Sequence, residues 1–139
     1  MYKKLTGKFN NKKGQAVVEL AIVLPLLILI LCGIIDYGWI FTNQNEVDNC
    51  AREGARYAII HATDPDAATS IVNYTKSLAT LNTASSLIVT VTFTNTDNPE
   101  MGDVTVAVSN QIQPLTPIAG IFTKGQKINL KSSCTMKVE

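Results

Sequence analysis

The sequence is poor in the side chains from which most active sites and metal sites are built. It has one histidine, His61, and three cysteines among 139 residues, too few for a metal site with the usual His/Cys spacing. Gly38 and Gly54 are isolated and belong to no phosphate-binding loop. No serine, threonine or cysteine has a general base at a sequence spacing that is typical of nucleophilic catalysis. We therefore expect a protein that is not an enzyme, with no metal, no cofactor and no small-molecule substrate.

Aromatic residues are also scarce, at 6% of the chain. We therefore do not expect a large aromatic core. An extracellular module that binds sugars or another surface ligand is a weaker hypothesis for this protein, because the sequence offers no group of aromatic residues on which a ligand could stack. Hydrophobic residues nevertheless make up 46% of the chain. This excludes disorder for most of it, because disordered segments are poor in apolar residues. The length suits one domain.

Charged residues make up 17% of the chain, and they are unevenly distributed. The first thirteen positions have no acidic residue but hold five of the twelve basic ones. A basic segment directly before an apolar run indicates membrane orientation, whereas a basic patch over a folded face would indicate nucleic acid. We expect these residues to stay cytoplasmic, and we expect no nucleic-acid partner. The five are Lys3, Lys4, Lys8, Lys12 and Lys13.

A long apolar run follows the basic segment. Between Leu20 and Ile35 there is no charged or strongly polar residue, and extension back to Gln15 adds one charge, Glu19. As a helix these 21 residues would span about 30 Å, the thickness of a bilayer core. The sequence therefore predicts a basic cytoplasmic leader at 1–14, a transmembrane helix at 15–38 and an extracytoplasmic body at 39–139.

Ordinary export signals fit this segment poorly. A cleaved secretory signal would have a shorter apolar core and a small-residue exit site, and a lipoprotein signal would need a small residue where Leu31 precedes Cys32. A permanent single-pass anchor with an extracytoplasmic interaction domain, without processing, fits the length and charge and remains the alternative. It leaves Glu19 unexplained, since a carboxylate within an apolar helix costs a few kcal/mol and suggests a function.

The spacing of Gly14 and Glu19 resembles the class III signal of type IV pilin-like proteins. In that family a prepilin peptidase cuts after the glycine, on the cytoplasmic side, and leaves the apolar helix attached. The resemblance implies a processing site at Gly14 and Gln15, with a new ammonium group at Gln15. It also implies that Glu19 neutralises this group on a neighbouring subunit. Opposite charges attract far more strongly in a low-dielectric bundle than in water.

Further motifs make the resemblance narrower. They are Leu24-Pro25-Leu26 within the apolar helix, Asp36-Tyr37-Gly38 at its end, and the segment AREGARY from Ala51 to Tyr57. With Gly14 and Glu19 they resemble the TadE-like family of minor pseudopilins from tight-adherence (Flp) pilus systems. Leu20 stands where many pilins have an aromatic residue, which weakens a major-pilin interpretation more than a minor-pseudopilin one.

This resemblance implies a structural role in building or priming a surface filament. The implied partners are a prepilin peptidase, other pilin subunits, the pilus assembly platform and the membrane. The implied location is the inner or cytoplasmic membrane, with the body outside, and then a cell-surface pilus. Pro25 would let the helix bend or locally melt when a subunit leaves the bilayer; the other interpretation is a tolerated kink.

The hydrophobic periodicity predicts an α+β, pilin-like fold. A pattern with spacings of three and four continues past the apolar run, so we expect one helix over 15–61, about 70 Å long. The helix-start signal Thr63-Asp64-Pro65-Asp66 predicts a second, short helix over 65–81. Strict alternation then predicts three strands, starting near Leu87, Val104 and Ile128, which form a small antiparallel sheet on the outer half of the long helix. Turns are expected at 96–103 and 114–117.

Two groups of residues in the outer half of the long helix are candidates for specific contacts. One group is Arg52, Glu53, Arg56 and Tyr57. Its charges form either a solvated face, with the pairs Asp48–Arg52 and Glu53–Arg56, or, as the family resemblance implies, a contact surface for another subunit. Cys50 on the inward side of the helix and Cys134 on the inward face of the last strand are candidates for a disulfide outside the cytoplasm. The alternative is two separate buried thiols.

Overall fold

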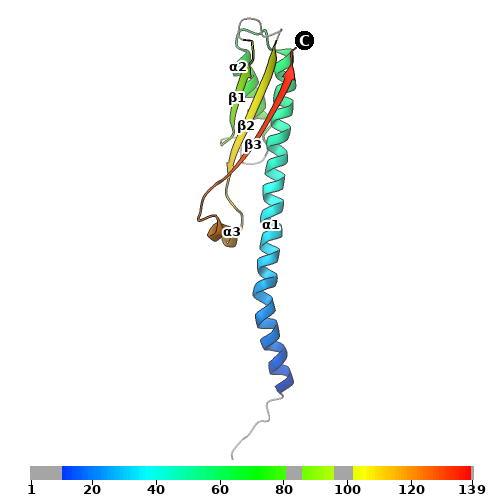
Figure 1. Cartoon of the computed structure of the whole chain (residues 1–139), viewed down its shortest axis with the longest axis vertical. Helices are drawn as coiled ribbons and strands as arrows, with labels where there is room; N and C mark the ends of the chain where they lie inside the picture. The colour runs from blue at the N-terminus through cyan, green and yellow to red at the C-terminus, as the bar shows by residue number, and fades with distance from the viewer. Residues whose placement is uncertain (1–10, 81–85, 96–101, 139) are drawn as a thin grey trace, which may run out of the picture.

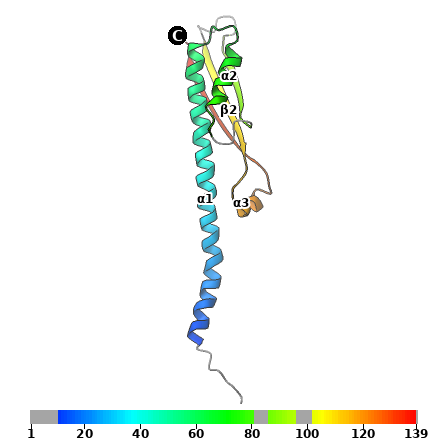
Figure 2. The same cartoon turned by 180° about the vertical axis from the view of Figure 1, so that it is seen from behind.

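The computed structural model describes residues 11–80, 86–95 and 102–138. It confirms the α+β fold, with one long helix, two short helices and a three-stranded antiparallel sheet (Figures 1 and 2). The elements are α1 (Asn11–Ile60), α2 (Ala67–Ser77), β1 (Ile88–Phe93), β2 (Asp103–Ile112), α3 (Pro117–Phe122) and β3 (Ile128–Lys137). Most of the predicted leader and most of the predicted turn at 96–103 lie outside the described residues.

The long helix α1 is one continuous element of 50 residues, which corresponds to about 75 Å. Leucines and alanines favour a helix, the valines and isoleucines of the apolar run lower the helix propensity only slightly, and Pro25 is the one proline within α1. The sheet and α2 pack against the second half of α1, and α3 lies beside its middle, near Leu29 to Asp36, while the part of α1 before Leu29 stands free of the body (Figures 1 and 2). The prediction of a single helix from the apolar run into the body is therefore confirmed.

The sheet has the order β1-β2-β3, and both pairings are antiparallel. In the central strand, Val104, Val106 and Val108 are buried, and the residues between them are half exposed. Val106 lies opposite Val91 of β1 and Cys134 of β3. The alternation predicted from the sequence is thus the alternation observed, since successive side chains in a strand point to opposite faces.

The core lies between this sheet, α2 and the second half of α1. Val47, Ala51, Ala55 and Ala58 of α1 are buried there, and so is Ile71 of α2. Small side chains on α1 let the sheet and α2 approach its backbone closely. The body therefore has its core along one side of the long helix, as the spacing of these residues predicts.

The start of α2 differs from the prediction. The chain forms turns after α1, with a hydrogen bond from the Asp64 amide to the His61 carbonyl at 3.2 Å, and the helix begins at Ala67 rather than at Pro65. Asp66 occupies the N-cap position without a capping hydrogen bond from its side chain. The helix ends at Ser77, and Leu81, the last residue of the predicted range, lies outside the described residues.

The short helix α3 was not predicted, since the sequence suggested a loop at 114–117. The Thr116 hydroxyl accepts a hydrogen bond from the Ala119 amide at 3.5 Å, and Pro117 occupies the first turn. A capping threonine followed by proline is a recognised helix start. Six residues are too few to show a helical period, which explains why the pattern was missed.

Candidate membrane-spanning and assembly site

The first half of α1 is apolar and uncovered. Its large side chains from Val17 to Ile35 are exposed to between 46% and 72%, on every side of the helix. By length and composition, this helix is the one candidate for crossing a membrane among the described residues. Its apolar segment lies near the N-terminus and has no share buried within the chain. A surface of this kind requires either lipid or other apolar helices around it.

The predicted processing site lies at the start of this helix. Gly14 is exposed, and a Cβ atom added there would meet nothing within 4 Å. Gln15 and Glu19 are exposed as well, and they lie about one turn apart along the helix. The structure thus presents Gly14, Gln15 and Glu19 on one exposed segment of the helix.

Pro25 lies within the helix, and the helix continues through it. A proline has no amide hydrogen, so the carbonyl oxygen of Ala21 has no amide to accept from at this turn. Membrane helices tolerate such a site because neighbouring helices and local adjustments can satisfy the freed carbonyl. The structure shows a helix that accommodates Pro25 without ending.

Asp36, at the end of the apolar run, holds the segment before α3. Its Oδ1 accepts hydrogen bonds from the amides of Leu115 and Thr116, both at 2.9 Å, and its Oδ2 accepts one from the Thr116 hydroxyl. The side chain of Asp36 is buried, with 6% exposed. This carboxylate therefore ties α1 to a segment that is distant in sequence. The sequence analysis noted Asp36 only as part of a motif and missed this role.

The predicted charged contact face is exposed on the outer half of α1. Arg52, Glu53 and Arg56 are exposed, and the Arg56 guanidinium lies 3.5 Å from the Glu53 carboxylate. The expected pair between Asp48 and Arg52 is not formed, because Asp48 accepts a hydrogen bond from Gln44 at 3.0 Å instead. Within the described part of the chain, Arg52 therefore remains free for a contact outside the chain.

Tyr57 belongs to the packing within the chain. Its ring stacks on Tyr74 of α2, with 4.2 Å between centroids, and on His61 at the end of α1, with 3.9 Å between centroids. The imidazole Nδ1 of His61 lies 3.0 Å from the Tyr57 carbonyl oxygen, so His61 is half buried rather than fully exposed. Of the four predicted contact residues, three lie on the open face and the fourth joins α1 to α2.

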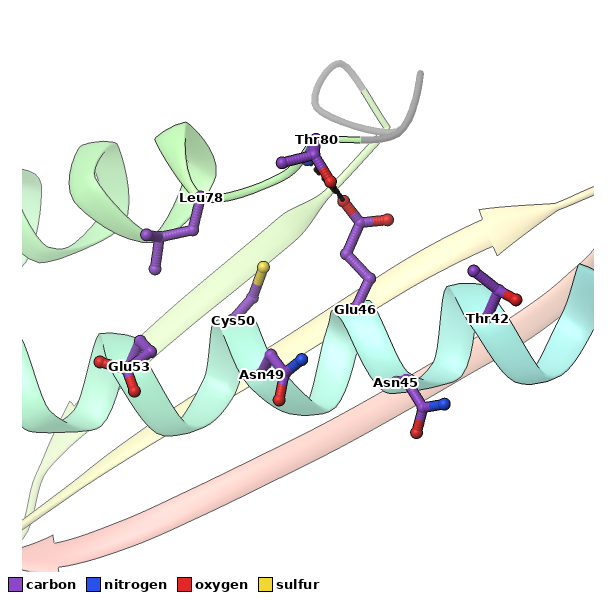
Figure 3. A pocket seen from close by; sticks show the side chains of 8 residues that line it. All are labelled: Thr42, Asn45, Glu46, Asn49, Cys50, Glu53, Leu78 and Thr80. Atoms are coloured by element: carbon purple, nitrogen blue, oxygen red, sulfur yellow. Dashed lines mark hydrogen bonds between the residues drawn. The ribbon is translucent and has the colours of Figure 1, made fainter.

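Glu46 connects α1 to the segment just after α2 (Figure 3). Its carboxylate accepts hydrogen bonds from the amide of Thr80, at 2.5 Å, and from the hydroxyl of the same residue, at 3.2 Å. An open cavity of about 440 Å³ lies beside it, with Cys50 and Leu78 in its wall. Burial raises the pKa of the Cys50 thiol, and the nearby Glu46 carboxylate adds to this effect.

The predicted disulfide is not formed, since Cys50 and Cys134 are both free thiols. Cys50 points toward α2 (Figure 3), whereas Cys134 lies on β3, the strand at the other edge of the sheet from β1. Both residues face the core, as expected, without forming a bond. The third cysteine, Cys32, is half exposed on the apolar segment. Among the described residues, no group of three or more potential ligands could hold a metal ion.

Comparison with known proteins finds a family match for one part of this chain. Residues 14–56 match the family model described as TadE-like protein. The match begins at Gly14, includes the apolar segment and Asp36, and ends at Arg56, so it covers about a third of the chain. It confirms the resemblance seen in the sequence and indicates a role in the tight-adherence pilus system. No curated protein and no solved structure matches the chain.

Proposed function

We propose that the chain is a structural minor pseudopilin of a tight-adherence pilus, processed after Gly14 by a prepilin peptidase. The observation that carries this proposal is the TadE-like match from residue 14 to 56, which starts at the glycine of the proposed cleavage site. The proposal assigns the protein no enzymatic activity: its work is packing against other subunits.

The local structure at Gly14 suits cleavage. Glycine in a helix interior is less stable than alanine by about 1 kcal/mol, so the helix unwinds there at lower cost than at its neighbours. Among the described residues, nothing lies within 4 Å of the position that a Cβ atom would take at Gly14. A peptidase at the cytoplasmic face of the membrane could therefore draw the segment into an extended conformation and cut between Gly14 and Gln15.

Glu19 then has a partner that the uncut chain lacks. Cleavage creates an ammonium group at Gln15, and in a bundle of pilin helices the Glu19 carboxylate of one subunit meets this group on a neighbour. Two such charges 4 Å apart attract by about 4 kcal/mol at an effective dielectric constant near 20. This attraction would offset the cost of a carboxylate in apolar surroundings and would fix the axial position of one subunit against the next.

The rest of α1 supplies the remaining contacts of the proposal. In the membrane, lipid covers the apolar segment, and the C-terminal body lies on the outer side because the basic leader stays inside. In the filament, neighbouring helices replace the lipid, and Arg52, Glu53 and Arg56 face the next subunit or the assembly platform. Pro25 allows the helix to adjust during this transfer.

The decisive experiment is the intact mass and N-terminal sequence of the membrane-extracted protein, with and without a co-expressed prepilin peptidase. We expect a start at Gln15 that requires the peptidase and that Gly14→Val abolishes. Gly38→Val, a matched change on the same helix, should still be processed. A chain that begins at Met1 while the same peptidase cuts the cognate major pilin would contradict the proposal and favour the permanent anchor.

A second experiment separates processing from assembly. Glu19→Gln keeps the size of the side chain and removes its charge. We expect this variant, like Glu19→Ala, to be processed and inserted but absent from sheared filaments, whereas Glu19→Asp should retain part of its incorporation. Equal recovery of Glu19→Gln and unchanged protein in the filament fraction would rule out the assigned role of the charge.

A further inference from the structure

The short helix α3 lies beside the end of the apolar segment of α1. Asp36 binds the chain just before α3, and a small cavity of about 110 Å³ lies between the two helices, with Leu29 and Cys32 on one side and Ile118 on the other. From Leu29 to Asp36, α1 makes about two turns. Both views show α3 apart from the sheet, alongside α1 (Figures 1 and 2). A bilayer that covers these turns of α1 therefore reaches α3.

The side chains of this region are apolar and exposed. Leu115 is 60% exposed and Ile121 is 76% exposed, and the sequence from Gln113 to Thr123 has no charged residue. On the neighbouring part of α1, Ile34 is 63% exposed. Two separate segments of the chain thus present uncovered apolar side chains at the same level. This continuity with the candidate membrane span indicates that lipid covers both.

Two lysines follow α3 directly. Lys124 and Lys127 are exposed, and within the described residues neither forms an ion pair. Lys124 has a positive φ of 53° in the turn that ends α3. Glycine or asparagine would adopt this conformation at lower cost, so the turn itself does not explain a lysine. An apolar helix with cations at its edge is the pattern of a segment lying at a bilayer surface.

Aromatic residues on α1 mark the same level. Tyr37 and Phe41 are 70% and 55% exposed, and their rings lie 6.2 Å apart at a small interplanar angle. Tyrosine is enriched where a membrane helix leaves the hydrocarbon core. Asp36, the attachment point of α3, directly precedes this pair. The interface therefore falls at the height where α3 is held.

We propose that α3 and the segment just before it form a second membrane contact, which inserts Leu115 and Ile121 into the leaflet through which α1 leaves the bilayer. Lys124 and Lys127 lie at the phosphates of anionic lipids. Asp36 positions the contact by binding its backbone. The body is thereby held against the membrane at two points, which fixes its rotation about α1. This inference rests on α1 spanning a membrane, and it requires neither cleavage nor a filament.

The test uses the full chain in phosphatidylcholine–phosphatidylglycerol vesicles, with quencher lipids brominated in the acyl chain. Trp39, the single tryptophan, is replaced by phenylalanine, and a new tryptophan is introduced by Ile121→Trp. The matched control is Ile60→Trp at the far end of α1, because Ile60 is also 76% exposed. Ile28→Trp, within the apolar segment, reports insertion of α1.

We expect the tryptophan of Ile121→Trp to emit at shorter wavelength than that of Ile60→Trp and to be quenched several-fold more strongly. Strong quenching in Ile28→Trp without quenching in Ile121→Trp would overturn the inference while leaving the membrane-spanning helix intact. Weak quenching in both Ile28→Trp and Ile121→Trp would overturn the membrane-spanning helix and the second membrane contact together. A blue shift in Ile121→Trp that grows with protein density and resists brominated lipid would mean that a second copy covers α3, and would also overturn it.

A measurement on the unaltered chain guards against misfolding of these variants. A water-soluble acetylating reagent should modify Lys124 and Lys127 several-fold more slowly in anionic vesicles than in neutral ones, by peptide mass mapping. Lys76, which is exposed on α2, should react equally in both. Equal rates for all three lysines in the two vesicle types would contradict the placement of α3 at the lipid headgroups.

Discussion

Gly54 lies where α2 and the sheet approach α1 without room for a side chain. A Cβ atom at this position would lie 2.5 Å from Oγ1 of Thr75 and 3.2 Å from Cγ1 of Val106. Thr75 is fully buried, and its hydroxyl donates a hydrogen bond to the Ile71 carbonyl at 2.7 Å. The side chain of Thr75 therefore cannot rotate away from the new methyl group without losing this bond.

We predict that Gly54→Ala lowers the free energy of unfolding of the body. Overpacking of a filled core costs about 1–3 kcal/mol, while the better helix propensity of alanine returns up to about 1 kcal/mol. The net loss should be about 1–2 kcal/mol. Gly38→Ala is the matched control on the same helix, because a Cβ there meets nothing within 4 Å. It should leave stability unchanged or raise it slightly.

The assay is urea unfolding of the full chain in detergent, followed by the fluorescence of Trp39, which packs against the body core. Thr75→Ala removes the atoms nearest to the new methyl group, so Gly54→Ala should cost at least 1 kcal/mol less in that background. The packing of α2 described above would be refuted if Gly54→Ala matched the unchanged protein. An identical loss of unfolding free energy from Gly54→Ala with and without Thr75→Ala would refute it as well.

Further predictions concern Cys50, Glu46 and Asp36. Because the pKa of Cys50 is raised, its thiol should react with iodoacetamide at pH 8 more slowly than that of Cys134. The contribution of the Cys50 thiol to stability should be constant below the ordinary thiol pKa and fall as pH rises above it, since the folded chain keeps a proton on this thiol that the unfolded chain loses; Cys50→Ala should remove this part of the pH dependence. Glu46→Gln weakens the hydrogen bonds to Thr80 and should lower the free energy of unfolding by about 1 kcal/mol. An unchanged free energy of unfolding would contradict the contact between Glu46 and Thr80. Asp36→Asn should speed hydrogen exchange at the two backbone amides that Asp36 binds without changing helix content by circular dichroism; unchanged exchange would contradict its anchoring role.

Much of this fold could be predicted because its main elements have strong local signals. The apolar run and the continuing spacing of Val47, Ala51, Ala55 and Ala58 define α1, and the alternation of valines defines β2. The family motifs likewise lie along one continuous stretch of the chain, almost all of it within the segment that the TadE-like model matches. These signals depend on residues near one another in sequence, so the pattern alone reports them.

Contacts between distant segments were harder to predict. The Cys50–Cys134 pairing required the direction of each side chain, and inward placement of both did not bring them together. The sequence analysis placed Tyr57 among the exposed contact residues of α1, yet its ring stacks on Tyr74 of α2. The sequence predicted a second helix but not where that helix packs against α1. Periodicity tells which face of an element is buried, but not which neighbour covers it.

Asp36 shows the physical limit of such prediction most clearly. Its partners lie 79 and 80 residues away, beyond the segment that matches the TadE-like family. Two of the three groups that it binds are backbone amides, which every residue except proline supplies. The sequence of the partner segment therefore need not carry a recognisable side-chain signal for this contact. The carboxylate at the end of the apolar run can hold loops of different sequence beside α1, provided that they offer free amides where a short helix begins.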